Sequence, residues 1–453
     1  MTSRVSLLIL GLLSCYKVAS YDPNDRLHLT PYIRQGNITT ARELSSVTYR
    51  DDNVATSHSG FITVDERLGN HLFFWFFPAI NSDPRAPLVV WLNGGPGEPS
   101  MLGLFHENGP LRLQPNGNGT FMLKIWNGSW AETFSMLYID NPVGVGYSYS
   151  DSGEIGCRTT QEGYSKDLYE FIQQFYIMFP EYLQRELYIG GQSYAGKYVT
   201  SLASRLHKQI LNKKSNIPLT GIYLGAPFID PYSQSKAMSG YFYSSGAISL
   251  RQHRDHQKLV DSIFDQLRVR QISADQAVTT LLMNNSIVGL WANNYNARSV
   301  TPYEELWYLM NTPAMRTLVH AGNTTFVIGD DGFRAKFNVD WTKSVKAELA
   351  VLLNTYKVLI YNGDLDAVVS SVMVDAALAV TRWSFKDRYG ESVRDVWTDG
   401  YKLKGFFTWT GKFCRVVIHG AGHNAPYDQP VLSLDMMSQF IKNGCIQNEN
   451  ILL

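Results

Sequence analysis

The chain has 453 residues, of which 45% are hydrophobic, and its 40 basic residues balance its 40 acidic residues. No net charge favours nucleic acid or an anionic membrane, so we expect neither as a partner. The length exceeds the roughly 250–300 residues at which one core usually stops growing, so we expect a core with an inserted lobe.

The first 20 residues are typical of a secretory signal peptide. Arg4 precedes an apolar run from Val5 to Leu13, and small residues at Val18-Ala19-Ser20 suit cleavage. The run is about half of the ~20 residues that a spanning helix needs, so we expect no membrane anchor. Residues 21–453 would then enter the secretory pathway, to be secreted or lysosomal. Five Asn-x-Ser/Thr sequons agree with this route, although each can stay unmodified: Asn37, Asn118, Asn127, Asn284 and Asn323.

The cysteine count limits what disulfides can contribute. Cys15 lies in the predicted signal, which leaves Cys157, Cys414 and Cys445. Three cysteines permit at most one intrachain disulfide and one free thiol, so the fold depends on packing. The sequence does not say which two are paired.

Seven short apolar runs bounded by turn residues are typical of buried strands. They are Leu72 to Phe77, Leu88 to Leu92, Met136 to Ile139, Glu186 to Ile189, Gly221 to Leu224, Val358 to Tyr361 and Arg415 to Ile418. Helical patterns lie between several of them, at Leu168 to Phe175 with i, i+3, i+4, i+7 spacing, at Tyr198 to Leu211, and at Leu432 to Ile441. This alternation predicts an α/β fold with a largely parallel sheet covered by helices on both sides.

The alternation breaks between about residues 233 and 313. Charged helical sequence at Gln252 to Arg270 and an Asn-rich, aromatic loop at Asn284 to Tyr303 replace the apolar strands, and core-like sequence resumes at Met315 to His320. We expect an inserted helical cap over the strand ends that selects substrates. An insertion that plays no part in substrate selection is an equal alternative.

Ser193 lies in the run from Gly190 to Tyr198, between a predicted strand and a predicted helix. An α/β-hydrolase presents its nucleophile at such a turn. The fit to G-x-S-x-G is imperfect, because Ala195 takes the last position, and the pair Ala195-Gly196 must then allow the helix to approach. Taken alone, a glycine-flanked serine of this kind is more often a turn or a helix cap.

Candidate partners for the serine follow in the order acid, then histidine, that an α/β-hydrolase requires. Asp364 and Asp366 follow the predicted strand that ends at Tyr361, and His419 and His423 follow the one that ends at Ile418. A serine hydroxyl needs a base to take its proton, and the base needs an acid to hold its tautomer. Three such loops in order are far more specific than any one.

The chain resembles the serine carboxypeptidases, and among them the vitellogenic-like branch. Five separated motifs carry the resemblance: Trp91 to Gly97 (WLNGGPG), Ile139 to Ser148 (IDNPVGVGYS), Gly191 to Tyr198 (GQSYAGKY), Tyr361 to Asp366 (YNGDLD), and Gly422-His423 with Pro426-Tyr427-Asp428. The resemblance covers nearly the whole chain after the signal and implies the α/β-hydrolase fold, with no cofactor and no metal. The substrates it implies are the C-termini of peptides or proteins.

The resemblance also implies a role for each site residue. Ser193 is the nucleophile, His423 the base and Asp366 the acid, whereas Asp364 and His419 would only stabilise their loops. The backbone N–H groups of Gly95 and Tyr194 form the oxyanion hole. Four residues bind the C-terminal carboxylate of the substrate: Asn93, Gly94, Glu107 and Gln192. A plain turn is the alternative for Asn93-Gly94-Gly95.

Gln192 departs from the family pattern, which has glutamate before the nucleophile. Paired acids can share a proton and bind the substrate carboxylate best at acidic pH, whereas the Gln192 amide donates at any pH. We therefore expect substrate binding to depend less on acidity, with Glu107 the only titrating member.

Glu98, Pro99 and Asn424 are further departures. Pro99 suits a first helical position, and Glu98 suits a helix N-terminus. A carboxylate three residues from Gly95 opposes the developing oxyanion, so we expect slower turnover. Asn424 replaces a common methionine beside His423, and we expect it to change the pocket for the leaving residue.

The expected function is a serine exopeptidase that releases C-terminal amino acids through an acyl-enzyme on Ser193. The departures leave two alternatives open. One is a catalytically weak peptide- or protein-binding module, and the other is an acyltransferase or esterase on the same scaffold.

Overall fold

The computed structural model describes residues 22, 25–48, 56–115, 121–126, 128–285 and 303–448. The predicted signal peptide lies outside these residues, as do the sequons at Asn118 and Asn127 and the side chain of Asn284. The other two sequon asparagines, Asn37 and Asn323, are exposed. Within the described ranges, no helix is long and apolar enough to cross a bilayer.

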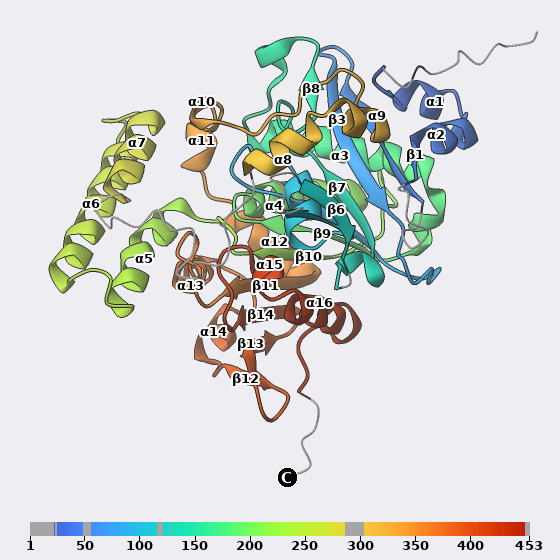
Figure 1. Cartoon of the computed structure of the whole chain (residues 1–453). Coiled ribbons are helices and arrows are strands. Elements are labelled where there is room, and N and C mark those ends of the chain that lie inside the picture. The colour runs from blue at the N-terminus through green and yellow to red at the C-terminus, as the bar shows by residue number, and fades with distance from the viewer. Residues whose placement is uncertain are drawn as a thin grey trace, which may run out of the picture.

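All seven predicted strands are present in the structure. They are β3 (Asn70–Phe77), β4 (Leu88–Leu92), β7 (Ser135–Ile139), β9 (Leu187–Gln192), β10 (Leu219–Gly225), β11 (Lys357–Gly363) and β14 (Phe413–Ile418). The six strands β7-β4-β9-β10-β11-β14 pair in parallel at the centre of the sheet (Figure 1). The expected parallel sheet is therefore correct for the centre.

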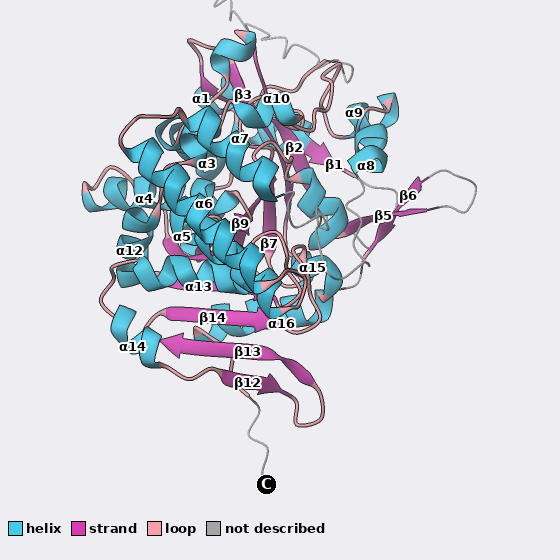
Figure 2. Ribbon diagram, turned by 90° about the vertical axis from the view of Figure 1, so that its left-hand side faces the viewer, coloured by secondary structure: helices cyan, strands magenta, loops and turns pink. Residues whose placement is uncertain are grey.

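Both edges of this sheet are antiparallel, which the sequence did not suggest. One edge adds β3, β2 (Ser57–Asp65) and β1 (Ser46–Val47), with β8 (Tyr149–Ser150) paired to β3. The other adds β13 (Leu403–Thr410) and β12 (Asp395–Thr398), which Figure 2 shows below β14. Of these strands only β3 was predicted, and it is buried along its whole length. The others are short, or polar residues and glycine interrupt their apolar runs.

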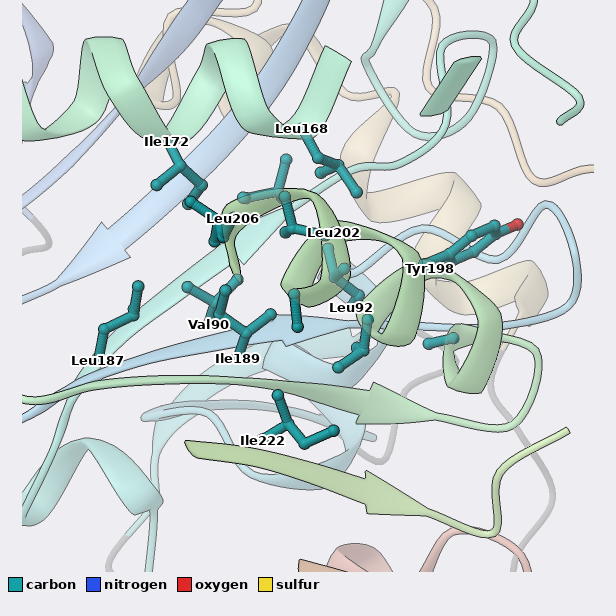
Figure 3. Close-up of a cluster of buried hydrophobic side chains, with 14 of the residues drawn as sticks. Val90, Leu92, Leu168, Ile172, Leu187, Ile189, Tyr198, Leu202, Leu206 and Ile222 are labelled. Atoms are coloured by element: carbon teal, nitrogen blue, oxygen red, sulfur yellow. The ribbon is translucent and has the colours of Figure 1, made fainter. Parts of the chain in front are cut away.

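Helices cover both faces of the sheet. Alternate residues of a strand point to opposite faces, so Val90 and Leu92 of β4 enter one apolar core while Val89 and Trp91 enter the other. The first core is completed by α3 (Gln161–Met178), α4 (Ala195–Leu211), α12 (Lys346–Thr355) and α13 (Ser371–Val380), and the second by α16 (Pro430–Asn443). Figure 3 shows α4 between the sheet and α3, with Leu202 and Leu206 facing this core.

The chain leaves the sheet after β10 and returns at β11 through a long helical stretch. Its helices are α5 (Pro231–Ser244), α6 (Leu250–Arg268), α7 (Ala274–Asn285), α8 (Tyr303–Met310), α9 (Pro313–Leu318), α10 (Asp331–Ala335), α11 (Asn338–Trp341) and then α12. Helices α6 and α7 pack on each other through a small apolar cluster and project to one side of the sheet (left in Figure 1). Met315 and Val319 are buried in the second core, as expected where core sequence resumes. That residues 233–313 act as a cap stays a prediction.

The remaining elements are short. They are α1 (Thr30–Arg34), α2 (Ile38–Ser45), the hairpin of β5 (Leu111–Pro115) and β6 (Phe121–Ile125), α14 (Lys386–Glu391), α15 (Ala425–Asp428), and single turns at Trp130–Glu132, Gly153–Gly156 and Pro180–Gln184.

Cys414 in β14 forms a disulfide with Cys445, which follows α16, and Cys157 is the free thiol of the described residues. The limit of one disulfide and one free thiol is thus confirmed, and the structure supplies the pairing that the sequence left open. The bond attaches the C-terminal helix to the strand that leads to His423.

Candidate active site

The predicted site residues lie in loops that leave one edge of the sheet. In register, Leu92 pairs with Gly191, Gln192 with Gly225, and Gly363 with Ile418, each at the carboxyl end of its strand. Ligands of open α/β sheets bind at this edge. The loops after β4, β9, β11 and β14 therefore leave the sheet together, although they are far apart in sequence.

Ser193 lies on a sharp turn between β9 and α4. Its φ is 62°, in the left-handed region that residues other than glycine seldom occupy. The turn is held by hydrogen bonds from the Ser193 N–H to the Gly225 carbonyl and from the Gly196 and Phe228 N–H groups to the Ser193 carbonyl, each 2.9 Å long. Strain that is stabilised in this way is typical of functional sites and of the hydrolase nucleophile turn.

Glycines let neighbouring segments approach this turn closely. A Cβ on Gly94 would lie 2.6 Å from the Gln192 carbonyl oxygen and the Tyr194 nitrogen, and 2.9 Å from the Ser193 Cβ. A Cβ on Gly196 would lie 2.8 Å from the Pro227 Cβ. Gly196 thus allows α4 to approach the sheet, as the sequence predicted, and Gly94 allows the turn after β4 to lie against the serine.

His423 and Asp366 contact each other across the loops after β14 and β11. The His423 Nδ1 lies 2.9 Å from the Asp366 Oδ2, and the Asp366 Oδ1 accepts hydrogen bonds from the backbone N–H groups of Val368 and Val369 at 2.8 and 3.0 Å. Burial lowers the pKa of His423, but the charge and hydrogen bond of Asp366 outweigh it, so that the net pKa lies above its usual value of 6.5. A more basic imidazole is a better acceptor for a serine proton.

Asp364 and His419 form a second pair on the same two loops. The His419 Nδ1 lies 2.7 Å from the Asp364 Oδ2, and the Gly420 N–H donates to the Asp364 Oδ1 at 2.8 Å. The side chains are 51% and 25% exposed, against 12% for His423 and 0% for Asp366. This pair joins the loops at the surface, while His423 and Asp366 form the buried pair.

The backbone N–H groups of Gly95 and Tyr194, predicted as the oxyanion hole, are free to donate to a ligand. In the part of the chain that the structure describes, neither N–H donates to a protein acceptor. Gly95 has a φ of 100°, which favours glycine. A Cβ at Gly95 would lie 2.7 Å from the Gly97 nitrogen. Two such donors at the Ser193 turn suit a developing oxyanion.

Asp340 and Lys197 anchor Tyr194 from behind, and sequence reasoning missed both. The Tyr194 hydroxyl donates to the Asp340 Oδ2 at 2.8 Å, and the Lys197 Nζ donates to the backbone carbonyls of residues 340, 341 and 343. All three side chains are buried. Asp340 is 146 residues from Tyr194 and lies in none of the five motifs, so no local pattern could have indicated it.

Asn93 and Glu107 form the core of the predicted carboxylate site. The Asn93 Oδ1 accepts from the Trp91 indole at 2.6 Å and from the Gly103 N–H at 3.0 Å, which turns its Nδ2 toward the Glu107 Oε1 at 3.2 Å. Glu107 ends a π-helical turn, Gly103–Glu107, of a kind frequent at functional sites.

Glu107 is fully buried, and its second carboxyl oxygen has no partner among the described residues. Burial raises its pKa to about 8, although the Asn93 hydrogen bond acts in the opposite direction. The carboxyl group is therefore protonated at neutral pH. Because the Oε1 accepts from Asn93, the proton lies on the Oε2, and this O–H group can donate a hydrogen bond to a ligand.

Two of the departures from the family pattern, Gln192 and Asn424, contact each other. The Gln192 Nε2 donates to the Asn424 Oδ1 at 3.2 Å, and both residues are buried. Asn424 thus orients the Gln192 amide as well as lying next to His423. The helix after Glu98-Pro99 begins at Met101, so Pro99 lies two residues before it and not at its first position as predicted.

Comparisons with known proteins agree with this site. A family model described as serine carboxypeptidase matches residues 50–443. The human protein named probable serine carboxypeptidase CPVL is 36% identical over 437 residues, 93% of this chain and 90% of its own. The vitellogenic carboxypeptidase of Aedes aegypti is 31% identical (92% and 90% covered), and the venom serine carboxypeptidase of Apis mellifera is 30% identical (95% and 93%).

Among solved structures, Kex1Δp, a prohormone-processing carboxypeptidase from Saccharomyces cerevisiae, superposes with a TM-score of 0.76 at 22% identity, covering 90% of this chain and 98% of its own. This match shows the fold.

The two aspartate–histidine pairs predict opposite results for matched variants. Asp366→Asn should slow phosphonylation of Ser193 by a fluorophosphonate probe about 10³–10⁴-fold, because an asparagine cannot hold the imidazole in the reactive tautomer. Asp364→Asn, which removes a carboxylate from the exposed pair, should label within about twofold of the parent chain. Labelling rates followed by fluorescence in gels check this, and equal loss in both variants would contradict the assignment.

Proposed function

The chain belongs to the serine carboxypeptidase family, and from that premise we propose how its residues release the C-terminal amino acid of a peptide. It is a serine-type hydrolase of exopeptidase class. The proposal rests on one observation above all, the buried His423–Asp366 pair at the same sheet edge as the left-handed Ser193 turn.

Acylation begins when the Ser193 Oγ attacks the carbonyl carbon of the last peptide bond. The serine proton passes to the His423 Nε2, because the Nδ1 is engaged with Asp366. The N–H groups of Gly95 and Tyr194 stabilise the oxyanion. His423 then protonates the leaving amine, the amino acid departs, and a water activated by the same imidazole hydrolyses the ester on Ser193.

Asn93, Gly94, Glu107 and Gln192 bind the free carboxylate of the substrate. The neutral Glu107 donates a hydrogen bond through its O–H group, and the Gln192 amide contributes a donor that does not titrate. Gly94 lines the carboxylate site with its backbone, because a side chain at this position would collide with the serine turn. Because the substrate carboxylate replaces water in a buried site, these donors also select for a free C-terminus.

Peptides, or the C-termini of proteins, are the substrates we propose, in the secretory pathway and either secreted or lysosomal. The signal-like N-terminus and the exposed sequon asparagines Asn37 and Asn323 support this route. Glycosylation of the other three sequon asparagines, Asn118, Asn127 and Asn284, stays a prediction.

An acyltransferase or esterase on this fold, or a weakly active binding module, has no need for one of two features of this site. An esterase needs no buried carboxylate site, whereas Asn93 and Glu107 are both buried and hydrogen-bonded here. A module that only binds needs no oriented histidine. The chain has both features, which favours the exopeptidase.

Release of the C-terminal amino acid from an N-blocked dipeptide tests the function directly. The parent chain should release it, and Ser193→Ala should lose at least about 10⁴-fold in kcat, because the nucleophile is absent. Mass spectrometry of the products with an added alcohol distinguishes hydrolysis from acyl transfer. A folded parent chain that neither hydrolyses the peptide nor labels with a fluorophosphonate would refute the enzyme.

The raised pKa of Glu107 predicts the pH dependence of substrate binding. Below about pH 8 the carboxyl group is protonated and donates, so KM should be nearly constant between about pH 5.5 and 7. Above that pKa the ionised Glu107 repels the substrate carboxylate, and KM should rise about tenfold per pH unit.

Glu107→Gln keeps a donor without a titrating group and should give a flat KM over the whole range. A pH series of KM on an N-blocked dipeptide checks both chains. Steep weakening between mildly acidic and neutral pH in the parent chain would be evidence against this binding mode.

A further inference from the structure

The carboxylate of Glu98 lies at the active site but has no role in the proposed reaction. Glu98 follows Gly95 by three residues and is half-buried. A Cβ built on Gly95 would lie 2.8 Å from the Glu98 nitrogen and 3.3 Å from its Cγ. The side chain therefore starts at the oxyanion turn itself.

Tyr303 holds the Glu98 carboxylate. Its hydroxyl donates to the Glu98 Oε1. Tyr303 begins α8, which is anchored in the second core by the buried residues Leu306 and Met310. Among the described residues, no lysine, arginine or histidine forms an ion pair with Glu98. The carboxylate is thus held in one place by a neutral donor, without a cation to balance its charge.

The charge of Glu98 acts on Glu107 and His423, the two residues that contact the leaving amino acid in the proposed reaction. Burial raises the pKa of Glu107, and Glu98 raises it further. Burial lowers the pKa of His423, Asp366 raises it, and Glu98 adds to that rise. In the proposed reaction Glu107 binds the carboxylate of the leaving residue, and His423 protonates its amine. The Glu98 N–H also donates to the carbonyl of Gly94, a residue of the proposed carboxylate site, at 3.2 Å. Glu98 is thus attached to the part of the site that binds the leaving residue.

The neighbouring carboxyl groups do not share this role. Asp366 faces His423, Asp428 accepts a hydrogen bond from the Gly422 N–H at 2.7 Å, and Glu107 is protonated at neutral pH. Of the described carboxyl groups at this site, Glu98 is left without an ion pair and without a role in the reaction. A cationic side chain on the substrate would supply a counter-charge and would also offset the repulsion of the oxyanion that slows turnover.

We propose that Glu98, held by Tyr303, is a specificity residue that favours substrates whose C-terminal residue is lysine or arginine. The inference rests on the proposed exopeptidase function and names the class of its leaving residue. Substrates that end in an acidic residue are disfavoured at the same position, because their side chain would meet a like charge.

Three N-blocked dipeptides that differ only in their last residue test this proposal. They end in lysine, in norleucine, which has a similar length without the charge, and in glutamate. The parent chain should cleave the lysine peptide at least about tenfold better in kcat/KM than the norleucine peptide, and the glutamate peptide worst. Glu98→Gln should reduce the lysine-to-norleucine ratio to about one.

Matched variants separate specificity from damage to the fold. Tyr303→Phe releases the carboxylate and should lower the ratio only in part, whereas Glu304→Gln removes the exposed neighbouring carboxylate of α8 and should leave the ratio unchanged. Cleavage of the norleucine peptide reports whether Glu98→Gln remains folded and active.

A parent chain that cleaves norleucine and lysine peptides equally well, or a Glu98→Gln chain that keeps the parent's ratio, would overturn the proposal while the exopeptidase function stands. Release of no amino acid from any of the three peptides would refute the proposed function itself, and the proposal with it.

Discussion

The contact between two backbone turns, one at Gly94 and one at Ser193, is the constraint on which the rest of the site depends. A Cβ at Gly94 would come within 2.6 Å of the serine turn, so the two turns meet with no side chain between them. Asn93, Gly95 and Glu98 belong to this same turn, so the contact holds all three close to the nucleophile. Oxyanion stabilisation, carboxylate binding and the proposed choice of leaving residue therefore depend on one short turn after β4.

Asp366 and Glu107 are both buried, but they differ in their hydrogen bonds and therefore in their roles. Asp366 accepts three hydrogen bonds and orients His423, whereas Glu107 accepts one, from Asn93, and burial keeps it neutral. A neutral Glu107 needs no second acid to share a proton with. In the binding mode that we propose, Gln192 can therefore replace glutamate, since its amide is oriented by Asn424. We expect the two departures together to move the pH limit of binding upward.

Local patterns predicted the elements that carry the chemistry. The six central strands and β3, the serine turn, and the order of acid and histidine were all visible, because buried strands are continuous apolar runs and their loops carry recognisable motifs. The edge strands other than β3 were missed because they are short or have polar residues and glycine between their apolar residues. Asp340 behind Tyr194, Tyr303 on Glu98 and Asn424 on Gln192 were also missed, since each contact joins residues more than 100 positions apart. Sequence showed which residues matter, and the fold showed which partners act on them.

Recognition of the free C-terminal carboxylate is what makes this serine site an exopeptidase, and one comparison tests it. The same N-blocked dipeptide is offered with a free C-terminal carboxylate and as its C-terminal amide, and kcat/KM is measured for each. The amide has one acceptor oxygen in place of two and turns an NH2 donor toward the donors of Asn93, Glu107 and Gln192, so it should be cleaved at least about 100-fold less efficiently. Equal cleavage of both peptides would contradict the role given to these residues.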